Sequence, residues 1–139
     1  MNPPSTLAPA TATQPAARRR FRAADVAEQL DMAVIGDICV GVSLAGYRSV
    51  MNGFLNDVSG SQAALLAALE RADSPALAAL AHAVKGAAAS MGLRAIQALA
   101  LRVEADGANY QAADCASAAA ALRERLDTTR ALLQRMGFV

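Results

Sequence analysis

The stretch 74-SPALAALAHAVKGAAASMG-92 contains the strongest helix signals in the chain and its only histidine, His82. Ser74 is a good N-cap residue, and Pro75 suits the first helical position because its missing N–H has no partner there anyway. Gly92 is a natural stop, since glycine readily adopts the left-handed conformation that ends many helices. We therefore expect a helix that begins at Pro75 and ends near Ser90.

Apolar residues recur along this helix at three- and four-residue intervals, which is typical of a helix with one face in a core. The expected core stripe is Leu77, Leu80, Ala81, Val84, Ala88 and Met91. His82 falls roughly 160° from the centre of this stripe, so we expect its side chain on the outer face. The expected neighbours on that face are Ala78, Ala79, Lys85, Gly86 and Ala89.

All of these neighbours except Lys85 are alanine or glycine, whereas an exposed helix face usually carries long charged side chains. Gly86 lies in the middle of the helix, where glycine costs about 1 kcal/mol relative to alanine. The pattern favours a surface cleared for another molecule, such as a partner backbone or a phosphoryl group. Ala78, Ala79, Gly86 and Ala89 are therefore candidate partner-binding residues.

The side chains around His82 narrow the chemistry that it can perform. An imidazole is a good nitrogen nucleophile near neutral pH, and Lys85, three residues on, can balance the charge of a phosphoryl group. No second histidine, cysteine or carboxylate stands beside it at metal-ligand spacing, so we expect no metal site. Ser90 is displaced around the helix, which argues against a serine triad. The alternative is an incidental surface histidine.

The rest of the chain also favours helix. Alanine and leucine dominate its apolar residues, and β-branched residues are sparse. Expected helices cover 23–30, 31–41 with Asp31 as N-cap, 44–73 with Ser43 as N-cap, 93–105, and 110–136 with Gly137 as stop. We predict an all-α, up-and-down four-helix bundle with an additional short N-terminal helix.

Three glycines in the 44–73 segment, Gly46, Gly53 and Gly60, are spaced seven residues apart. One interpretation is a smooth stripe that another helix approaches closely. The other is that one of them, most plainly Gly60, interrupts the helix.

Composition divides the chain into a flexible tail, 1–24, and a bundle domain, 25–139. The tail is rich in Pro, Thr and Ala and carries Arg18, Arg19, Arg20 and Arg22 with no acid. The domain carries nine basic and twelve acidic residues, so we expect no nucleic-acid binding. The arginines are best interpreted as the end of a solvated linker, with a membrane surface, an acidic partner or a transit peptide as alternatives.

The remaining signals concern location and assembly. Cys39 and Cys115 lie far apart in helical stretches and favour free thiols in a reducing cytosol. No uninterrupted apolar run approaches the ~18 residues of a membrane span, and no secretory signal is evident, so we expect a cytoplasmic protein without membrane insertion. Polar outer faces elsewhere favour a monomer.

The string HAVKGAAASMG resembles the signature of histidine-containing phosphotransfer (HPt) domains, which is His-x-x-Lys-Gly, small residues, a hydrophobe and Gly. The matching residues are His82, Lys85, Gly86, Ala87, Ala88, Met91 and Gly92, and the resemblance extends over about residues 31–136. Ala87 replaces the commoner serine, and Leu93 stands where alanine is frequent. The resemblance implies a four-helix bundle that exchanges a phosphoryl group with the aspartate of a response-regulator receiver domain.

The resemblance also implies roles for individual residues. His82 would be the phospho-acceptor, Lys85 would stabilise phosphate and Gly86 would leave room for docking. Family members often carry Gln or Glu on the following helix, bonded to the other ring nitrogen of the histidine, and Glu104 is the matching position. An ordinary solvated position near the helix end is the alternative for Glu104.

The implied partners are a receiver domain and a hybrid sensor histidine kinase, with Mg²⁺ supplied by the receiver and no cofactor in this chain. No glycine-rich nucleotide loop is present, so we expect no kinase activity. Two other functions stay open, a docking module that is never phosphorylated and a helical adaptor that uses Arg18–Arg22. Whether the domain stands alone or ends a hybrid kinase also stays open.

Overall fold

The computed structural model describes residues 22–139. Most of the predicted tail, 1–24, lies outside these residues. Helix already begins at Ala23, two residues before the predicted domain boundary. The division into tail and domain stays a prediction.

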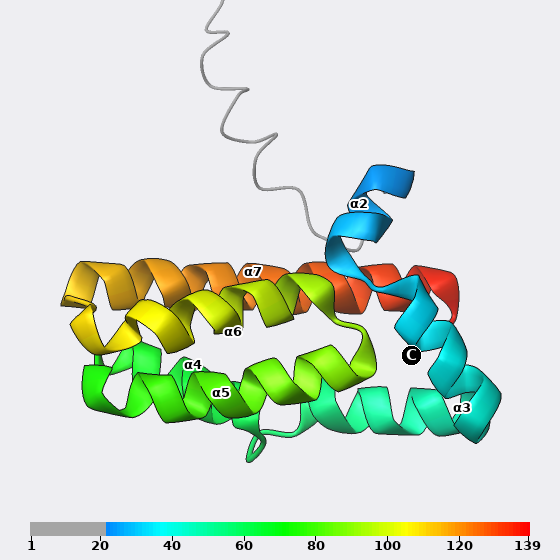
Figure 1. Ribbon diagram of the computed structural model, residues 1–139, viewed down its shortest axis with the longest axis horizontal. Helices are drawn as coiled ribbons and strands as arrows, with labels where there is room; N and C mark the ends of the chain where they lie inside the picture. Colours follow the sequence, from blue (N-terminus) through cyan, green and yellow to red (C-terminus); the bar gives the residue numbers. More distant parts are fainter. Residues whose placement is uncertain (1–21) are drawn as a thin grey trace, which may run out of the picture.

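The described residues form a bundle of helices without strands (Figure 1). The elements in chain order are α2 (Ala23–Gln29), α3 (Met32–Asn56), α4 (Ser61–Glu70), α5 (Ser74–Met91), α6 (Arg94–Asp106), the short 3₁₀ helix η3 (Gly107–Asn109) and α7 (Ala112–Met136). The bundle has four helical columns. Helices α3 and α4 follow each other and form one column, and α5, α6 and α7 form the other three. The predicted four-helix bundle with a short N-terminal helix is confirmed.

Helix α7 runs antiparallel to α3 and α4, and arginines join these elements at successive levels. Arg48 Nε donates to the carbonyl of Gly137 at 2.7 Å, and Arg130 donates to the carbonyl of Leu55 at 2.8 Å. Further along, Arg123 forms an ion pair with Glu70 at 2.5 Å. These contacts close the bundle between its first and last columns.

The N-terminal end is more elaborate than predicted because α3 changes direction at Ser43. This residue has φ 72° inside the helix, and its Oγ accepts a hydrogen bond from the Gly46 N–H at 3.2 Å. Ser43 therefore caps the second half of α3, as predicted. Asp31 caps the first half, since its side chain accepts from the Val34 N–H.

One of the two alternatives for the segment 44–73 was confirmed, and one expected helix cap was wrong. The predicted helix 44–73 is interrupted at residues 57–60, and Gly60 is the N-cap of α4, so Gly60 interrupts the segment. A Cβ on Gly53 would meet nothing within 4 Å, so no other helix approaches there. The N-cap of α5 is Asp73 rather than Ser74, whose hydroxyl instead donates to the carbonyl of Tyr110 at 2.8 Å.

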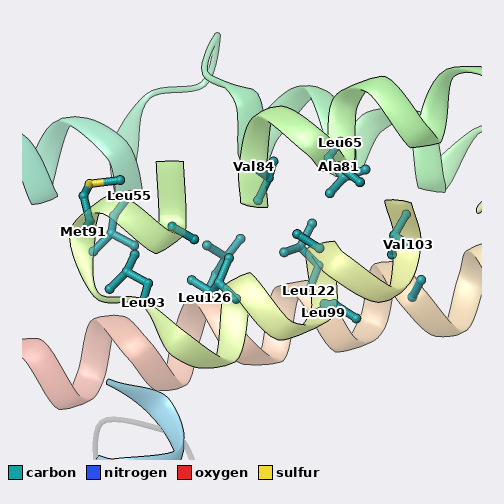
Figure 2. Packing of buried hydrophobic residues seen from close by; sticks show 14 of the residues in the cluster. Leu55, Leu65, Ala81, Val84, Met91, Leu93, Leu99, Val103, Leu122 and Leu126 are labelled. Carbon is teal, nitrogen blue, oxygen red and sulfur yellow. The ribbon is translucent and has the colours of Figure 1, made fainter. Parts of the chain in front are cut away.

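The core joins apolar side chains from all four columns (Figure 2). Of the predicted α5 stripe, Leu77, Ala81, Val84, Ala88 and Met91 are buried, whereas Leu80 is half-buried. Helix α6 adds Ile96, Leu99 and Val103, and α7 adds Leu122 and Leu126. Because this stripe packs inward, the opposite face of α5 is presented to solvent.

Both cysteines are free thiols, with Cys115 buried and Cys39 half-buried. By length and apolar composition alone, the run Met32–Glu70 is a candidate for a membrane-crossing helix. One such run is weak evidence, and the chain changes direction at Ser43 within it.

Candidate functional site

The site depends on a tight reversal between α5 and α6 at Gly92. This residue has φ +77°, and a Cβ there would lie 2.8 Å from Ile35 Cγ1 and 2.9 Å from the carbonyl oxygen of Asp31. Only glycine fits this backbone conformation and this space. The reversal returns α6 alongside α5, so residues far apart in sequence lie at the same level.

Glu104 on α6 contacts both polar side chains of the outer α5 face. Its Oε2 lies 2.8 Å from His82 Nδ1, and its Oε1 accepts a hydrogen bond from Lys85 Nζ at 2.8 Å. The three predicted polar residues therefore form one cluster, His82–Glu104–Lys85. The contact between Glu104 and Lys85 was not predicted.

The cluster keeps Glu104 charged. The hydrogen bond from Lys85, followed by the one from His82, holds the pKa of the Glu104 carboxyl below its ordinary value. A carboxylate can only accept hydrogen bonds, so Nδ1 of His82 must carry the hydrogen in its bond to Glu104. In the neutral ring this leaves Nε2 unprotonated, and the His82 side chain is 74% exposed.

A family model for the Hpt domain matches residues 49–132, more than half of the chain, and this range includes the whole cluster. The chain belongs to the Hpt domain family. No curated protein and no solved structure matches it. The match begins after the first half of α3, so it is shorter than the predicted extent of 31–136. Membership implies phosphotransfer in two-component signalling.

The predicted partner-binding residues of this Hpt domain lie around the cluster. Ala79 and Gly86 are exposed beside His82, whereas Ala78 and Ala89 are half-buried. A Cβ on Gly86 would meet nothing within 4 Å, so the packing of the described residues does not require glycine at this position.

Two outward residues near the cluster were missed in the sequence. Ala83 is exposed next to His82, and its outward position follows from the same helical spacing. Leu101 on α6 is 53% exposed, three residues before Glu104. Applying helical spacing to 93–105 would have placed Leu101 off the stripe formed by Ile96, Leu99 and Val103.

The polar groups near the cluster support neither a serine nucleophile nor a metal site. Ser90 Oγ donates to the carbonyls of Gly86 and Ala87 at 3.0 Å each, so its hydroxyl is engaged by its own helix. Across residues 22–139, no three His, Cys, Asp or Glu side chains gather in a way that could hold a metal ion. What the cluster presents is one exposed ring nitrogen.

Proposed function

We propose that this Hpt domain is a phosphorelay intermediate that accepts a phosphoryl group on Nε2 of His82 and exchanges it with the aspartate of a receiver domain. The observation that carries the proposal is the bond between His82 Nδ1 and Glu104 at 2.8 Å. It occupies one ring nitrogen as a donor and leaves the other free as a nucleophile.

The transfer step balances without any other reactant. The Nε2 lone pair attacks phosphorus, the Nε2–P bond forms, and the bond from phosphorus to the aspartyl oxygen breaks with its electron pair returning to the carboxylate. The Nδ1 proton stays in its bond to Glu104, whose negative charge balances the positive ring. The reverse step passes the group to another receiver.

Lys85 supports the phosphoryl group in this proposal. Its ammonium lies beside the ring, bonded to Glu104 Oε1 at 2.8 Å. Rotation of the side chain from that oxygen toward a phosphoryl oxygen on Nε2 exchanges one anionic partner for another. The Mg²⁺ that orients the phosphoryl group belongs to the receiver, and this chain contributes no cofactor.

The surface around His82 is the proposed docking surface for the receiver and for a hybrid sensor histidine kinase. Ala78, Ala79, Gly86 and Ala89 carry little bulk there, so a partner can approach the ring closely. The domain acts as a cytoplasmic monomer and a carrier without kinase activity. It binds neither nucleic acid nor membrane.

The test is label transfer from a panel of purified, ³²P-phosphorylated receiver domains. We expect at least one receiver to give acid-labile, base-stable label on the wild type and none on His82→Gln, with circular dichroism confirming that the variant is folded. Label that persists on His82→Gln would contradict the site. Receiver binding without label would instead indicate a docking module.

Lys85→Met separates phosphate stabilisation from nucleophilicity. Because His82 and Glu104 remain, we expect transfer to persist at a rate reduced about tenfold, the size of a charge-assisted hydrogen bond of roughly 1.5 kcal/mol. Single-turnover kinetics with the reactive receiver measure this. An unchanged rate would remove Lys85 from the mechanism.

A further inference from the structure

Leu101 is a large apolar side chain that α6 exposes beside the His82–Glu104–Lys85 cluster. Most of the other exposed large apolar residues lie on α3 or in the loop that follows it. Those residues are Met32, Val40, Val42, Leu44, Val50 and Val58, and Met136 lies at the end of α7. Leu101, with 53% exposure, is the one on the α5–α6 hairpin among the described residues.

The register of α5 against α6 places Leu101 next to the docking surface. Glu104 contacts both His82 and Lys85, and the two helices run antiparallel from the reversal at Gly92. Moving one turn from Glu104 toward the reversal on α6 reaches Leu101, and moving one turn from His82 in the same direction on α5 reaches Lys85 and Gly86. Leu101 therefore lies level with Gly86.

The residues of α6 on either side of Leu101 are also small. Ala105, four residues after Leu101, is exposed, and Ala98, three residues before it, is exposed toward α2 and α7. Ala79, Ala83 and Gly86 are exposed on α5, so Leu101 is the large apolar side chain among exposed small residues of the two helices. An exposed aliphatic side chain can act as the central anchor of an interface when a pocket of the partner receives it.

We infer that Leu101 is the apolar anchor for the receiver domain, which covers α6 as well as α5 when its phosphoaspartate reaches His82. The inference rests on the proposed function. A specific protein interface covers about 800 Å² on each partner, and a receiver that brings phosphorus to Nε2 must cover the surface within about 10 Å of it. Leu101 lies one turn from the carboxylate that holds the ring, inside this footprint. Its partner residue is an apolar side chain or pocket beside the receiver's aspartate.

The test compares Leu101→Asp with a matched control, Leu44→Asp. Leu44 is the same residue type with 44% exposure, and it lies on α3. It belongs to the same end of the bundle as Tyr47, whose hydroxyl donates to the Met91 carbonyl, about 14 Å along α5 from His82. Both substitutions add one charge at an exposed site, so neither should prevent folding.

Two phosphodonors separate docking from chemistry. The first is the phosphorylated receiver that transfers fastest to the wild type, and the second is phosphoramidate, a small donor that needs no docking surface. We expect Leu101→Asp to lower the second-order transfer rate from the receiver at least tenfold. Leu101→Ala should lower it about threefold to tenfold. Leu44→Asp should leave it unchanged, and phosphoramidate should label all four proteins at one rate.

Each other outcome overturns the inference in a recognisable way. If Leu101→Asp accepts phosphoryl groups from the receiver at the wild-type rate, Leu101 is not part of the interface, although His82 is still the phosphorylated residue. Equal losses with the receiver and with phosphoramidate place the effect on the cluster itself. A dimer that Leu101→Asp dissociates on gel filtration, with transfer unchanged, assigns the face to a second copy. If no receiver labels the wild type, the proposed function fails first, before any Leu101 variant is made.

Discussion

At the scale of single residues, the chemistry depends on how one carboxylate is shared. Glu104 accepts from Lys85 through one oxygen and from His82 through the other, each at 2.8 Å. The first contact keeps the carboxylate charged, and the second determines which ring nitrogen carries hydrogen. A glutamine at 104 could accept from Nδ1 as well, but it would bring no charge to balance a phosphorylated ring.

Glu104 should contribute stability that depends on pH. Its pKa is lowered in the folded protein, so the contribution is complete above the ordinary value of 4.5 and is lost as pH falls through the lower folded value. We expect Glu104→Gln to melt below the wild type at neutral pH, with the difference shrinking as the pH falls below 4.5. Thermal melts by circular dichroism over this range measure it.

A double-mutant cycle tests the cause. In a Lys85→Met background the hydrogen bond from Lys85 to Glu104 is absent. The same Glu104→Gln change should then lower the melting temperature less at neutral pH. If the cost is equal in both backgrounds, Lys85 does not stabilise the carboxylate.

At the scale of elements, the α5–α6 hairpin carries the site. Gly92 ends α5 in the left-handed conformation, and its N–H and the Leu93 N–H bond back to the carbonyls of Ala89 and Ala88. The Asp31 N–H also donates to the Gly92 carbonyl at 2.8 Å, which ties the start of α3 to the reversal. This turn therefore determines that Glu104 of α6 lies opposite His82 of α5.

Gly92→Ala and Gly86→Ala should therefore change stability in opposite directions. A Cβ at Gly92 clashes with Ile35 and Asp31 at a positive φ, and we expect a loss of about 1–3 kcal/mol. A Cβ at Gly86 meets nothing, and we expect a gain of about 0.5–1 kcal/mol from helix propensity. Urea unfolding measures both. A neutral Gly92→Ala would mean that the turn relaxes without cost.

At the scale of the whole molecule, small and large side chains share the core. Ala81, Ala88 and Ala100 are buried where α5 and α6 meet, so small residues also occupy the inner face. Larger apolar side chains fill the rest of the core, and they include Leu65 of α4 and Leu122 of α7 (Figure 2). Leu77 and Val84 of α5 are fully buried in the same core.

Leu122→Ala should destabilise the bundle far more than Leu101→Ala. Leu122 is 1% exposed, and emptying its space should cost about 2–5 kcal/mol. Leu101 is half exposed, and its truncation should stay within about 0.5 kcal/mol. Urea unfolding of the two variants beside the wild type provides the comparison. Similar losses from both would mean that Leu101 belongs to the core.

Local chemistry determined much of this protein in the sequence alone. Helix ends at Asp31, Gly92 and Gly137 follow from capping groups and left-handed glycines, which act within a few residues of themselves. The outward position of His82 follows from helical spacing, because a 3.6-residue period fixes which side chains share a face.

Only the tertiary structure decided how those elements meet. The hydrogen bond from Ser74 to Tyr110, the Lys85–Glu104 contact and the level of Leu101 against Gly86 all depend on one helix packing against another. That register is set by side chains and turns distributed over the whole bundle, and no short stretch of sequence contains it. The histidine and its contact with Glu104 were expected from the sequence, whereas the contact of Glu104 with Lys85 and the level of Leu101 against Gly86 emerged only from the packing of α6 on α5.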